Sequence, residues 1–83
     1  MGIILDLSAN PGDIRELTPT YDYYTVRTFD MVGDSTDHTI LRSVIPGTGC
    51  ILDFTDIGDQ VTDYVDVKDI TVVNGKLRVR SVS

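Results

Sequence analysis

The sequence has few of the residues that staple a small fold or build a catalytic centre. Its 83 residues include one cysteine, Cys50, one histidine, His38, and no tryptophan. A single cysteine excludes an intrachain disulfide, and the chain offers no set of cysteine and histidine ligands for a structural metal. Alanine and glutamate occur once each, at Ala9 and Glu16, whereas valine, isoleucine and threonine are frequent. This composition favours strands over helices.

The short length limits how much surface the chain can bury. Residues 1–83 suffice for a single domain, and a chain of this size buries roughly 60–65% of the surface exposed in its unfolded state. Small domains without disulfides or metals often gain stability by association. We therefore expect one all-β domain that forms a homo-oligomer or joins a larger protein assembly, with no cofactor and no bound metal.

Basic residues are scarce and unevenly placed. The net charge is −6, from 13 acidic and 7 basic side chains. This balance argues against nucleic acid as a partner, because phosphate contacts need a basic surface. Residues 1–67 carry twelve acids and three bases, whereas residues 68–83 carry four bases and one acid. The C-terminal segment is either a solvated strand face or a basic surface that docks on acidic groups.

No long hydrophobic run is present. The first residues, "MGIILDLSA", lack a basic start. Asp6 interrupts their apolar run, which is therefore too short for the hydrophobic region of a signal peptide. No segment is long and apolar enough for a transmembrane helix. We expect neither a signal peptide nor a membrane partner, and the unpaired Cys50 fits a reducing compartment.

What the chain does contain is a series of short β-prone segments separated by turn residues. Strands are expected at residues 2–7, 21–32, 38–45, 50–57 and 61–73, followed by a hairpin. The pattern predicts a small antiparallel β-sandwich or barrel of six to seven short strands.

Two segments allow a helical interpretation. Residues 13–17 are too short to assign, and a single helical turn is one interpretation. Within residues 56–67, apolar residues stand at helical spacing, but β-branched residues favour a strand.

The segment "DITVVNGKLRVR" near the C-terminus has the strongest local pattern. Asn74-Gly75 is the preferred pair for a two-residue type I′ turn, and that turn places Asp69 opposite Arg80. One face of the ribbon is then apolar and consists of Ile70, Val72, Leu77 and Val79. The apolar alternation changes phase near Lys68-Asp69, which indicates a bulge. The sequence thus predicts a C-terminal type I′ hairpin.

Several segments hold residue types found in catalytic or ligand sites, but none has the full pattern. "DSTDH", residues 34–38, combines a hydroxyl, a carboxylate and an imidazole, and Cys50 with His38 is a second nucleophile pair, yet catalysis needs such groups to converge. Gly47-x-Gly49 precedes a strand rather than a helix, which favours a turn over a phosphate loop. We therefore expect no catalytic, cofactor-binding or metal-binding residues and no enzymatic activity.

Acidic residues recur along the second half of the chain. Clustered carboxylates suit calcium, but the spacing here lacks the acids and the glycine of an EF-hand loop. A solvated acidic surface is the simpler interpretation. The acids in this ladder are Asp53, Asp56, Asp59, Asp63, Asp66 and Asp69.

Aromatic and basic residues supply the candidate interface. Tyr21, Tyr23 and Tyr24 provide much of the aromatic surface, and tyrosine suits interfaces because one end is apolar and the other polar. At least one of the three is expected in the core. The predicted interface residues are Tyr21, Tyr23, Val73, Lys76, Arg78, Arg80 and Val82.

The valine- and threonine-rich segments and the terminal "TVVNGKLRVRSVS" resemble the small all-β structural proteins of tailed-phage virions, such as capsid decoration (cement) proteins and tail components. The resemblance implies a non-enzymatic structural protein that acts in multiple copies. It also implies further copies of the chain, or a capsid or tail protein, as partner. The location would be the virion, assembled in the host cytoplasm.

Two other functions fit the same composition. One is a monomeric small β-barrel that binds a peptide or a small ligand. The other is a swinging-arm carrier with a modified lysine. Against the carrier, Lys68 lies at the predicted bulge and Lys76 lacks the carrier motif.

Overall fold

The computed structural model describes residues 2–80, which form nine β-strands and no helix. β1 and β3 are the longest strands. In chain order the strands are β1 (Gly2–Ala9), β2 (Ile14–Leu17), β3 (Tyr23–Met31), β4 (Thr39–Ser43), β5 (Cys50–Asp53), β6 (Gln60–Thr62), β7 (Val65–Lys68), β8 (Ile70–Val73) and β9 (Leu77–Val79).

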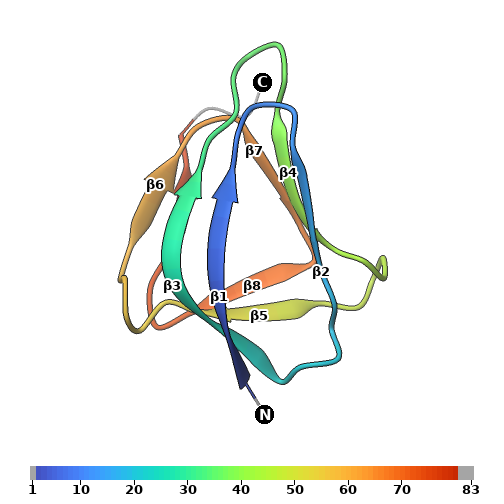
Figure 1. Cartoon of the computed structure of the whole chain (residues 1–83), viewed down its shortest axis with the longest axis vertical. Coiled ribbons are helices and arrows are strands. Elements are labelled where there is room, and N and C mark those ends of the chain that lie inside the picture. The colour runs from blue at the N-terminus through green and yellow to red at the C-terminus, as the bar shows by residue number, and fades with distance from the viewer. Residues whose placement is uncertain (1, 81–83) are drawn as a thin grey trace.

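All strand pairs in this part of the chain are parallel. β1, β3, β5 and β8 form one sheet, β2, β4 and β7 form a second, and β6 pairs with β9. The chain therefore winds as a coil in which each turn stacks its strands on those of the turn before, like a β-solenoid (Figure 1). We call each turn a rung: rung 1 holds β1 and β2, rung 2 holds β3 and β4, rung 3 holds β5 to β7, and rung 4 holds β8 and β9.

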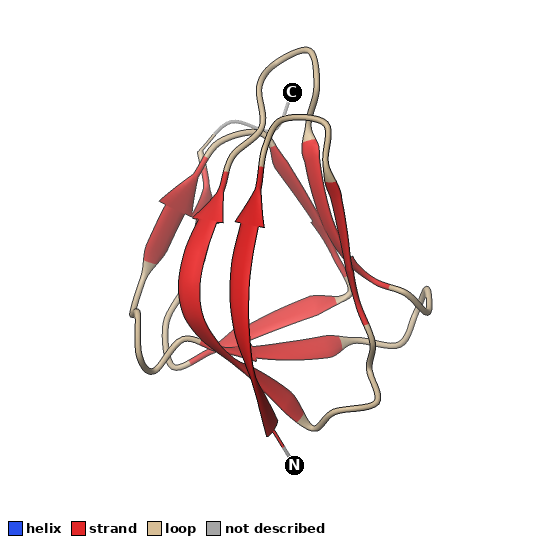
Figure 2. Cartoon of the chain, in the orientation of Figure 1, coloured by secondary structure: helices blue, strands red, loops and turns tan. Residues whose placement is uncertain are grey.

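Viewed along the coil axis, the strands outline a triangle (Figure 1, Figure 2). β5 and β8 lie on one side, and β2, β4 and β7 lie on the second. β6 and the upper parts of β1 and β3 form the third. The shortest dimension of the molecule is 16 Å. Four strand layers spaced about 4.8 Å apart account for that thickness.

A bulge lets β1 and β3 bend from one side of the triangle to the next. The register shifts between Leu5 and Asp6, so that Arg27 is an extra residue on β3. The Arg27 guanidinium donates hydrogen bonds of 3.2 and 2.8 Å to the two carboxylate oxygens of Asp6. This pair lowers the pKa of Asp6 and raises the pKa of Arg27, and it ties rung 1 to rung 2.

The interior is filled by columns of side chains, one from each rung. In one column, Ile3, Tyr24, Leu52 and Val72 follow one another through the sheet register. Burial of these apolar columns is the main stabilising contribution to the coil. The buried apolar residues are Leu7, Ala9, Leu17, Tyr24, Val26, Met31, Leu41, Cys50, Leu52, Phe54 and Val65.

Two threonines are also buried, and each satisfies its hydroxyl on the backbone of another segment. The Thr39 hydroxyl lies 2.8 Å from the carbonyl oxygen of Asn10 and 2.7 Å from that of Val32. The Thr62 hydroxyl donates to the carbonyl of Met31, which places β6 next to the end of β3. Buried polar groups therefore join rungs rather than weaken the core.

Three corners of rungs 3 and 4 turn on a single residue with positive φ. Tyr64 (φ 56°) separates β6 from β7, Asp69 (φ 56°) separates β7 from β8, and Asn74 (φ 59°) follows β8. The change of phase expected near Lys68-Asp69 is therefore present. It marks a corner of the coil, however, and not a bulge within a hairpin.

The prediction of an antiparallel sandwich or barrel was wrong. Alternating apolar residues specify strands, and turn residues specify the breaks between them, but neither specifies which strands pair. Paired residues lie 21, 28 and 20 residues apart in the first sheet and 26 apart in the second. The rest of a rung supplies the long crossover that parallel pairing requires.

The predicted C-terminal hairpin was also wrong, because β8 pairs with β5 and β9 pairs with β6. Asn74 has the positive φ that suits asparagine in a turn, but Gly75 does not share it, so no type I′ turn forms. A Cβ at Gly75 would lie 2.9 Å from the Cβ of Phe54. Glycine is required there because the previous rung approaches so closely.

The two ambiguous segments are strands. Residues 56–67 contribute β6 and the start of β7, so the strand interpretation is confirmed and the helical alternative is wrong. Residues 13–17, too short to assign from the sequence, contain β2, so the helical turn given as one interpretation is wrong.

Candidate functional site

The residue types considered for catalysis lie apart. His38 Nδ1 is 3.1 Å from both carboxylate oxygens of Asp66, and its ring packs 5.5 Å from that of Tyr64. Cys50 is buried, and its thiol donates weakly to the carbonyl of Leu17 at 3.5 Å. His38 precedes β4 and Cys50 begins β5, so they lie at different corners of the coil.

The rest of the "DSTDH" segment is a turn. The backbone N–H groups of Thr36 and Asp37 both donate to Oδ1 of Asp34, at 3.0 and 2.6 Å. The Asp34 carboxylate therefore organises its own loop. Across residues 2–80, no group of three or more histidine, cysteine or acidic side chains is placed to hold a metal ion.

The acidic ladder of the sequence connects neighbouring rungs. Asp66 binds His38 of the previous rung, and Asp63 binds Arg80 of the next rung through hydrogen bonds of 3.2 and 2.8 Å. Asp59 Oδ1 accepts from the Lys76 backbone at 3.0 Å, and Asp69 Oδ2 accepts from Gly47 N at 3.0 Å. The acids thus act as ties along the coil, a role that their spacing alone does not reveal.

Glu16 and Arg42 make a further tie of this kind, with a distance of 3.0 Å between the carboxylate and the guanidinium. In the sheet register, Glu16 of β2 is opposite Arg42 of β4, and Arg42 is opposite Lys68 of β7. The outer face of this sheet therefore carries a column that starts with an acid and ends with two bases.

The predicted interface residues do not form one surface. Tyr23 and Val73 lie on the outer face of the first sheet and are 40% and 37% exposed. Lys76 and Arg78 are exposed on rung 4. Arg80 is already paired with Asp63, and Val82 lies outside the described residues.

Of the other two candidate tyrosines, Tyr21 lies in the loop that joins rungs 1 and 2, and Tyr24 lies at the start of β3. Tyr24 is buried, and its hydroxyl donates to the Thr18 carbonyl at 2.9 Å while accepting from Thr18 N at 3.1 Å. Burial raises the pKa of Tyr24. Tyr21 packs edge-on against its ring, with centroids 5.6 Å apart. The prediction that at least one of the three tyrosines lies in the core is therefore confirmed by Tyr24.

An apolar hollow lies at the end of the coil, where rung 4 and β7 have no strand stacked on them in residues 2–80. It has a volume of about 420 Å³. Inward-facing side chains that an additional rung would cover form its lining. We call this surface the open end, and its apolar residues are Val67, Ile70, Val72, Leu77 and Val79.

Within residues 2–80, the open end also carries backbone groups that no other strand pairs with. In β8, Cys50 N donates to Asp69 O and Phe54 N donates to Val73 O, so the odd residues face β5. Because a strand alternates its backbone groups between its two edges, Ile70 and Val72 direct theirs to the free edge. The same reasoning applies to Val65 and Val67, since Thr39 N donates to Tyr64 O.

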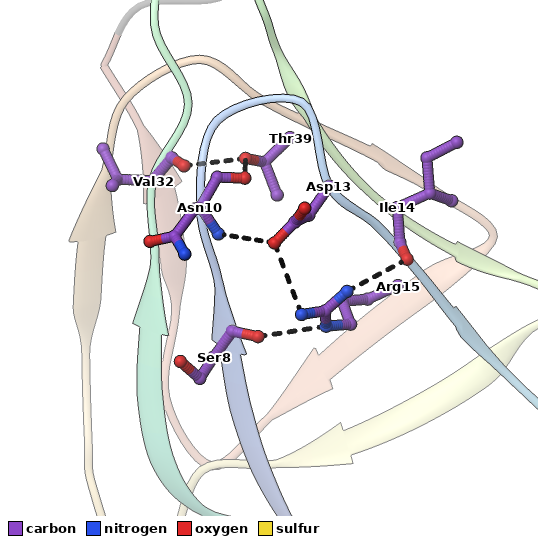
Figure 3. A network of polar contacts seen from close by, with 7 residues as sticks. All are labelled: Ser8, Asn10, Asp13, Ile14, Arg15, Val32 and Thr39. Atoms are coloured by element: carbon purple, nitrogen blue, oxygen red, sulfur yellow. Dashed lines mark hydrogen bonds and ion pairs between the residues drawn. The ribbon is translucent and has the colours of Figure 1, made fainter.

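The opposite end of the coil, formed by β1 and β2, is covered in part by Arg15 (Figure 3). In the register of the sheet Arg15 is opposite Leu41, a buried core residue, so its side chain points inward. Its guanidinium donates to Ser8 O at 3.0 Å and lies 3.4 Å from the Asp13 carboxylate. We call this surface the Arg15 end. It is polar where the open end is apolar.

Sequence reasoning identified four of the five apolar residues of the open end, as one face of the predicted hairpin. It missed Val67 and Arg15. The sequence feature that relates these two residues is a constant spacing. Arg15, Leu41 and Val67 stack in one column, and each lies 26 positions after the one before it. Because the rungs differ in length elsewhere, this spacing does not recur as a repeat along the chain.

The chain matches no family model, no curated protein and no solved structure. No helix in residues 2–80 could cross a membrane.

Proposed function

We propose that this chain is a non-enzymatic structural protein that acts in multiple copies, with the open end as its main assembly surface. The observation that carries the proposal is the combination, at one end of the coil, of an apolar floor and parallel strand edges on which no strand of residues 2–80 is stacked. Strand edges of this kind readily pair with another chain, and proteins usually block them with charge, bulges or a covering segment.

The apolar floor strengthens this argument. Apolar patches that remain uncovered on a small protein commonly mark an interaction surface. Here the side chains and the free backbone groups come from the same residues, Ile70, Val72 and Val67, so one added layer of strand would satisfy both. Exposed Lys76 and Arg78 border the same rung and remain part of the proposed interface.

A place in a phage virion is the narrower form of this proposal. Its support is the resemblance of the valine- and threonine-rich segments to capsid decoration and tail proteins. A small all-β chain that presents an apolar hollow beside open strand edges suits a protein that works as one of many identical copies.

A second candidate is a monomeric module that binds an extended peptide or a small apolar ligand at the open end. The hollow of about 420 Å³ favours it, since ligand sites commonly measure roughly 300–1,000 Å³. A peptide would satisfy the strand edge as a further copy does, so the number of copies in solution separates the two candidates.

The test is the mass of the purified full chain by sedimentation velocity and light scattering at micromolar concentration. Assembly predicts a mass that is a multiple of 9.2 kDa. Leu77→Glu places a charge in the open end and should abolish assembly. Val61→Glu is the matched control, because Val61 is 53% exposed on the outer face of the neighbouring strand β6. A folded wild-type monomer would contradict the proposal.

A further inference from the structure

We infer that the outer face of the first sheet is a second contact surface between copies of this chain, and that two copies pack there face to face. The inference goes beyond the proposed function, which uses the open end, and adds a lateral contact to the same assembly. We call this surface the Ile51 face. Its outward-pointing residues are Gly2, Ile4, Tyr23, Thr25, Ile51, Asp53, Thr71 and Val73.

The sheet register determines which side chains form this face. Tyr24, Leu52 and Val72 stand in one column with Ile3, and Leu52 is fully buried, so this column points into the coil. Successive residues of a strand point to opposite faces, so the residues on either side of the column point outward. The Ile51 face therefore consists of two columns that run across β1, β3, β5 and β8.

Much of the Ile51 face is apolar. Ile4 is 63% exposed, and Ile51 is 39% exposed. Tyr23 and Val73, which are also exposed, are two of the interface residues that the sequence predicts. Tyrosine is enriched at protein interfaces, where it combines a large apolar area with a polar hydroxyl. Covering these four side chains would remove apolar surface from water, which is the dominant favourable term in most protein association.

The position of the Tyr23 ring makes the face flat. A Cβ at Gly2 would collide with the carbons of that ring, so the ring lies over the backbone of the neighbouring strand β1. The ring therefore does not project away from the sheet, and glycine at position 2 leaves the room for it. Two flat sheet faces can pack against one another at a separation of about 10 Å.

Charge distinguishes the Ile51 face from the other two sides of the triangle (Figure 1). Asp53 is the one charged side chain among its eight outward positions. The Oδ1 atom of Asp53 accepts three hydrogen bonds, from Thr55 and Asn74, which stabilise the charge within the chain. Charged residues are more frequent at the outward positions elsewhere: Glu16, Arg42, Asp66 and Lys68 on the second sheet, and Asp6, Asp30 and Arg78 on the third side.

This charge pattern selects a second copy as the occupant. The chain has a net charge of −6, so two copies repel one another where unbalanced charges meet. Burial of charged side chains also costs desolvation free energy unless each gains a partner. The Ile51 face reduces both costs, because an identical face supplies a matching apolar surface that carries little charge. A two-fold axis relates the two copies, and such a contact closes at the dimer.

The size of the face limits the strength of the contact. Four strands spaced about 4.8 Å apart, with four residues of about 3.3 Å each, span roughly 200–300 Å². A standard interface buries about 800 Å² per partner, so this contact alone is weak, with an expected Kd of about 0.1–1 mM. When the open end already holds copies in one particle, the high effective concentration makes the same contact effective.

The full chain with Leu77→Glu isolates this contact, because the substitution blocks the open end. Sedimentation equilibrium of this variant should show monomers and dimers with a Kd of about 0.1–1 mM. Adding Ile4→Glu should weaken the dimer at least about tenfold, because like charges then meet in the contact. Val61→Glu is the matched control, since Val61 is 53% exposed on the third side of the coil, and it should leave the dimer unchanged.

Amide chemical shifts locate the contact without a substitution in the face itself. In a dilution series of the Leu77→Glu variant over the same concentrations, the shifts that change should belong to the four strands of the first sheet. They should include Ile4, Ile51 and Val73. Circular dichroism of each variant verifies that the strand content is retained.

The other outcomes overturn the inference. A Leu77→Glu variant that stays monomeric up to about 1 mM has no contact at the Ile51 face. Equal weakening by Ile4→Glu and Val61→Glu, or shift changes confined to the second sheet or the third side, would place the contact elsewhere. In each case the proposed function stands if the wild-type chain assembles at micromolar concentration. A wild-type chain that is monomeric at that concentration, with a Leu77→Glu variant that dimerises as expected, contradicts the proposed function alone.

Discussion

The side-chain amide of Asn74 donates a hydrogen bond of 3.0 Å to Oδ1 of Asp53 on the previous rung. The same carboxylate oxygen accepts from the Thr55 hydroxyl at 2.6 Å and from Thr55 N at 2.9 Å. Asp53 thereby anchors both the end of β5 and the corner that follows β8. The hydrogen bond to Asp53 holds Asn74 at the corner between two sides of the coil, where its φ is positive.

These contacts predict a pH-dependent contribution of Asp53 to stability. The hydrogen bond from Thr55, followed by that from Asn74, lowers the pKa of Asp53 below its value in the unfolded chain. Its contribution is therefore full above the unfolded pKa of about 3.9 and is lost as the pH falls through the folded value. Asp53→Asn should be less stable than wild type at about pH 7, with a difference that shrinks towards about pH 3.

Urea unfolding followed by circular dichroism at several pH values measures this difference. Asp56→Asn provides an acid-to-amide change in the adjacent loop as a comparison. If Asp53→Asn is less stable than wild type by the same amount from neutral to acid pH, the charge of the Asp53 carboxylate does not cause the loss of stability.

Gly33 should tolerate no side chain. A Cβ there would lie 2.1 Å from the Tyr64 carbonyl oxygen and 2.7 Å from Thr39 N, where backbone segments of two rungs meet. Gly33→Ala should therefore cost about 3 kcal/mol of unfolding free energy. Gly47→Ala is the matched control: its Cβ meets nothing within 4 Å, and only the φ of +85° opposes it, at a cost of about 1 kcal/mol. Denaturant unfolding ranks the two, and an equal cost would contradict the close approach.

Tyr24→Phe should destabilise the coil by about 1–2 kcal/mol, because the Thr18 carbonyl and N–H lose the hydroxyl that pairs with them. Tyr21→Phe keeps the edge-on ring contact and should change stability by less than about 0.5 kcal/mol. Thermal unfolding of the two variants provides the comparison. The hydroxyl of Tyr24 has no structural role if both substitutions prove equally mild.

Substitution of the two residues considered as nucleophile and base should leave assembly intact. His38→Ala loses a contact with the Asp66 carboxylate. Partly exposed pairs of this kind contribute only about 0–1 kcal/mol to stability. Cys50→Ser keeps the size of the buried side chain and leaves the Leu17 carbonyl as acceptor. Particle mass and melting temperature are measured together. Loss of assembly at unchanged melting temperature would assign one of these residues a direct role.

Local pattern identified many of the strands but not their partners. The alternation of Ile3, Leu5 and Leu7 and the β-branched content of residues 38–45 specify strands whatever lies beside them. Asn74-Gly75 was misassigned because a left-handed corner and a type I′ turn require the same residue types. The two differ only in contacts made 21 residues away, those of Asn74 with Asp53 and of Gly75 with Phe54.

The candidate site was identified in part for the same reason. The inward positions Ile70, Val72, Leu77 and Val79 share a face in a hairpin and in a coil, so their grouping survived the change of fold. The polar Arg15 end could not be inferred. An inward-pointing arginine contradicts the usual alternation, and its acceptors Ser8 and Asp13 become neighbours only when rung 1 closes.

The ties between neighbouring rungs have a mechanical consequence. Pairs such as Asp6–Arg27 and Asp63–Arg80 connect each turn of the chain only to the next, as the strand pairing does. In quasi-one-dimensional folds of this kind, stability is a sum over neighbouring units. A pulling force applied between the two ends of the chain would therefore load the hydrogen bonds of one turn at a time. The coil would peel open in steps at modest force, whereas the same protein pressed from its sides would bear the load on all its sheets together.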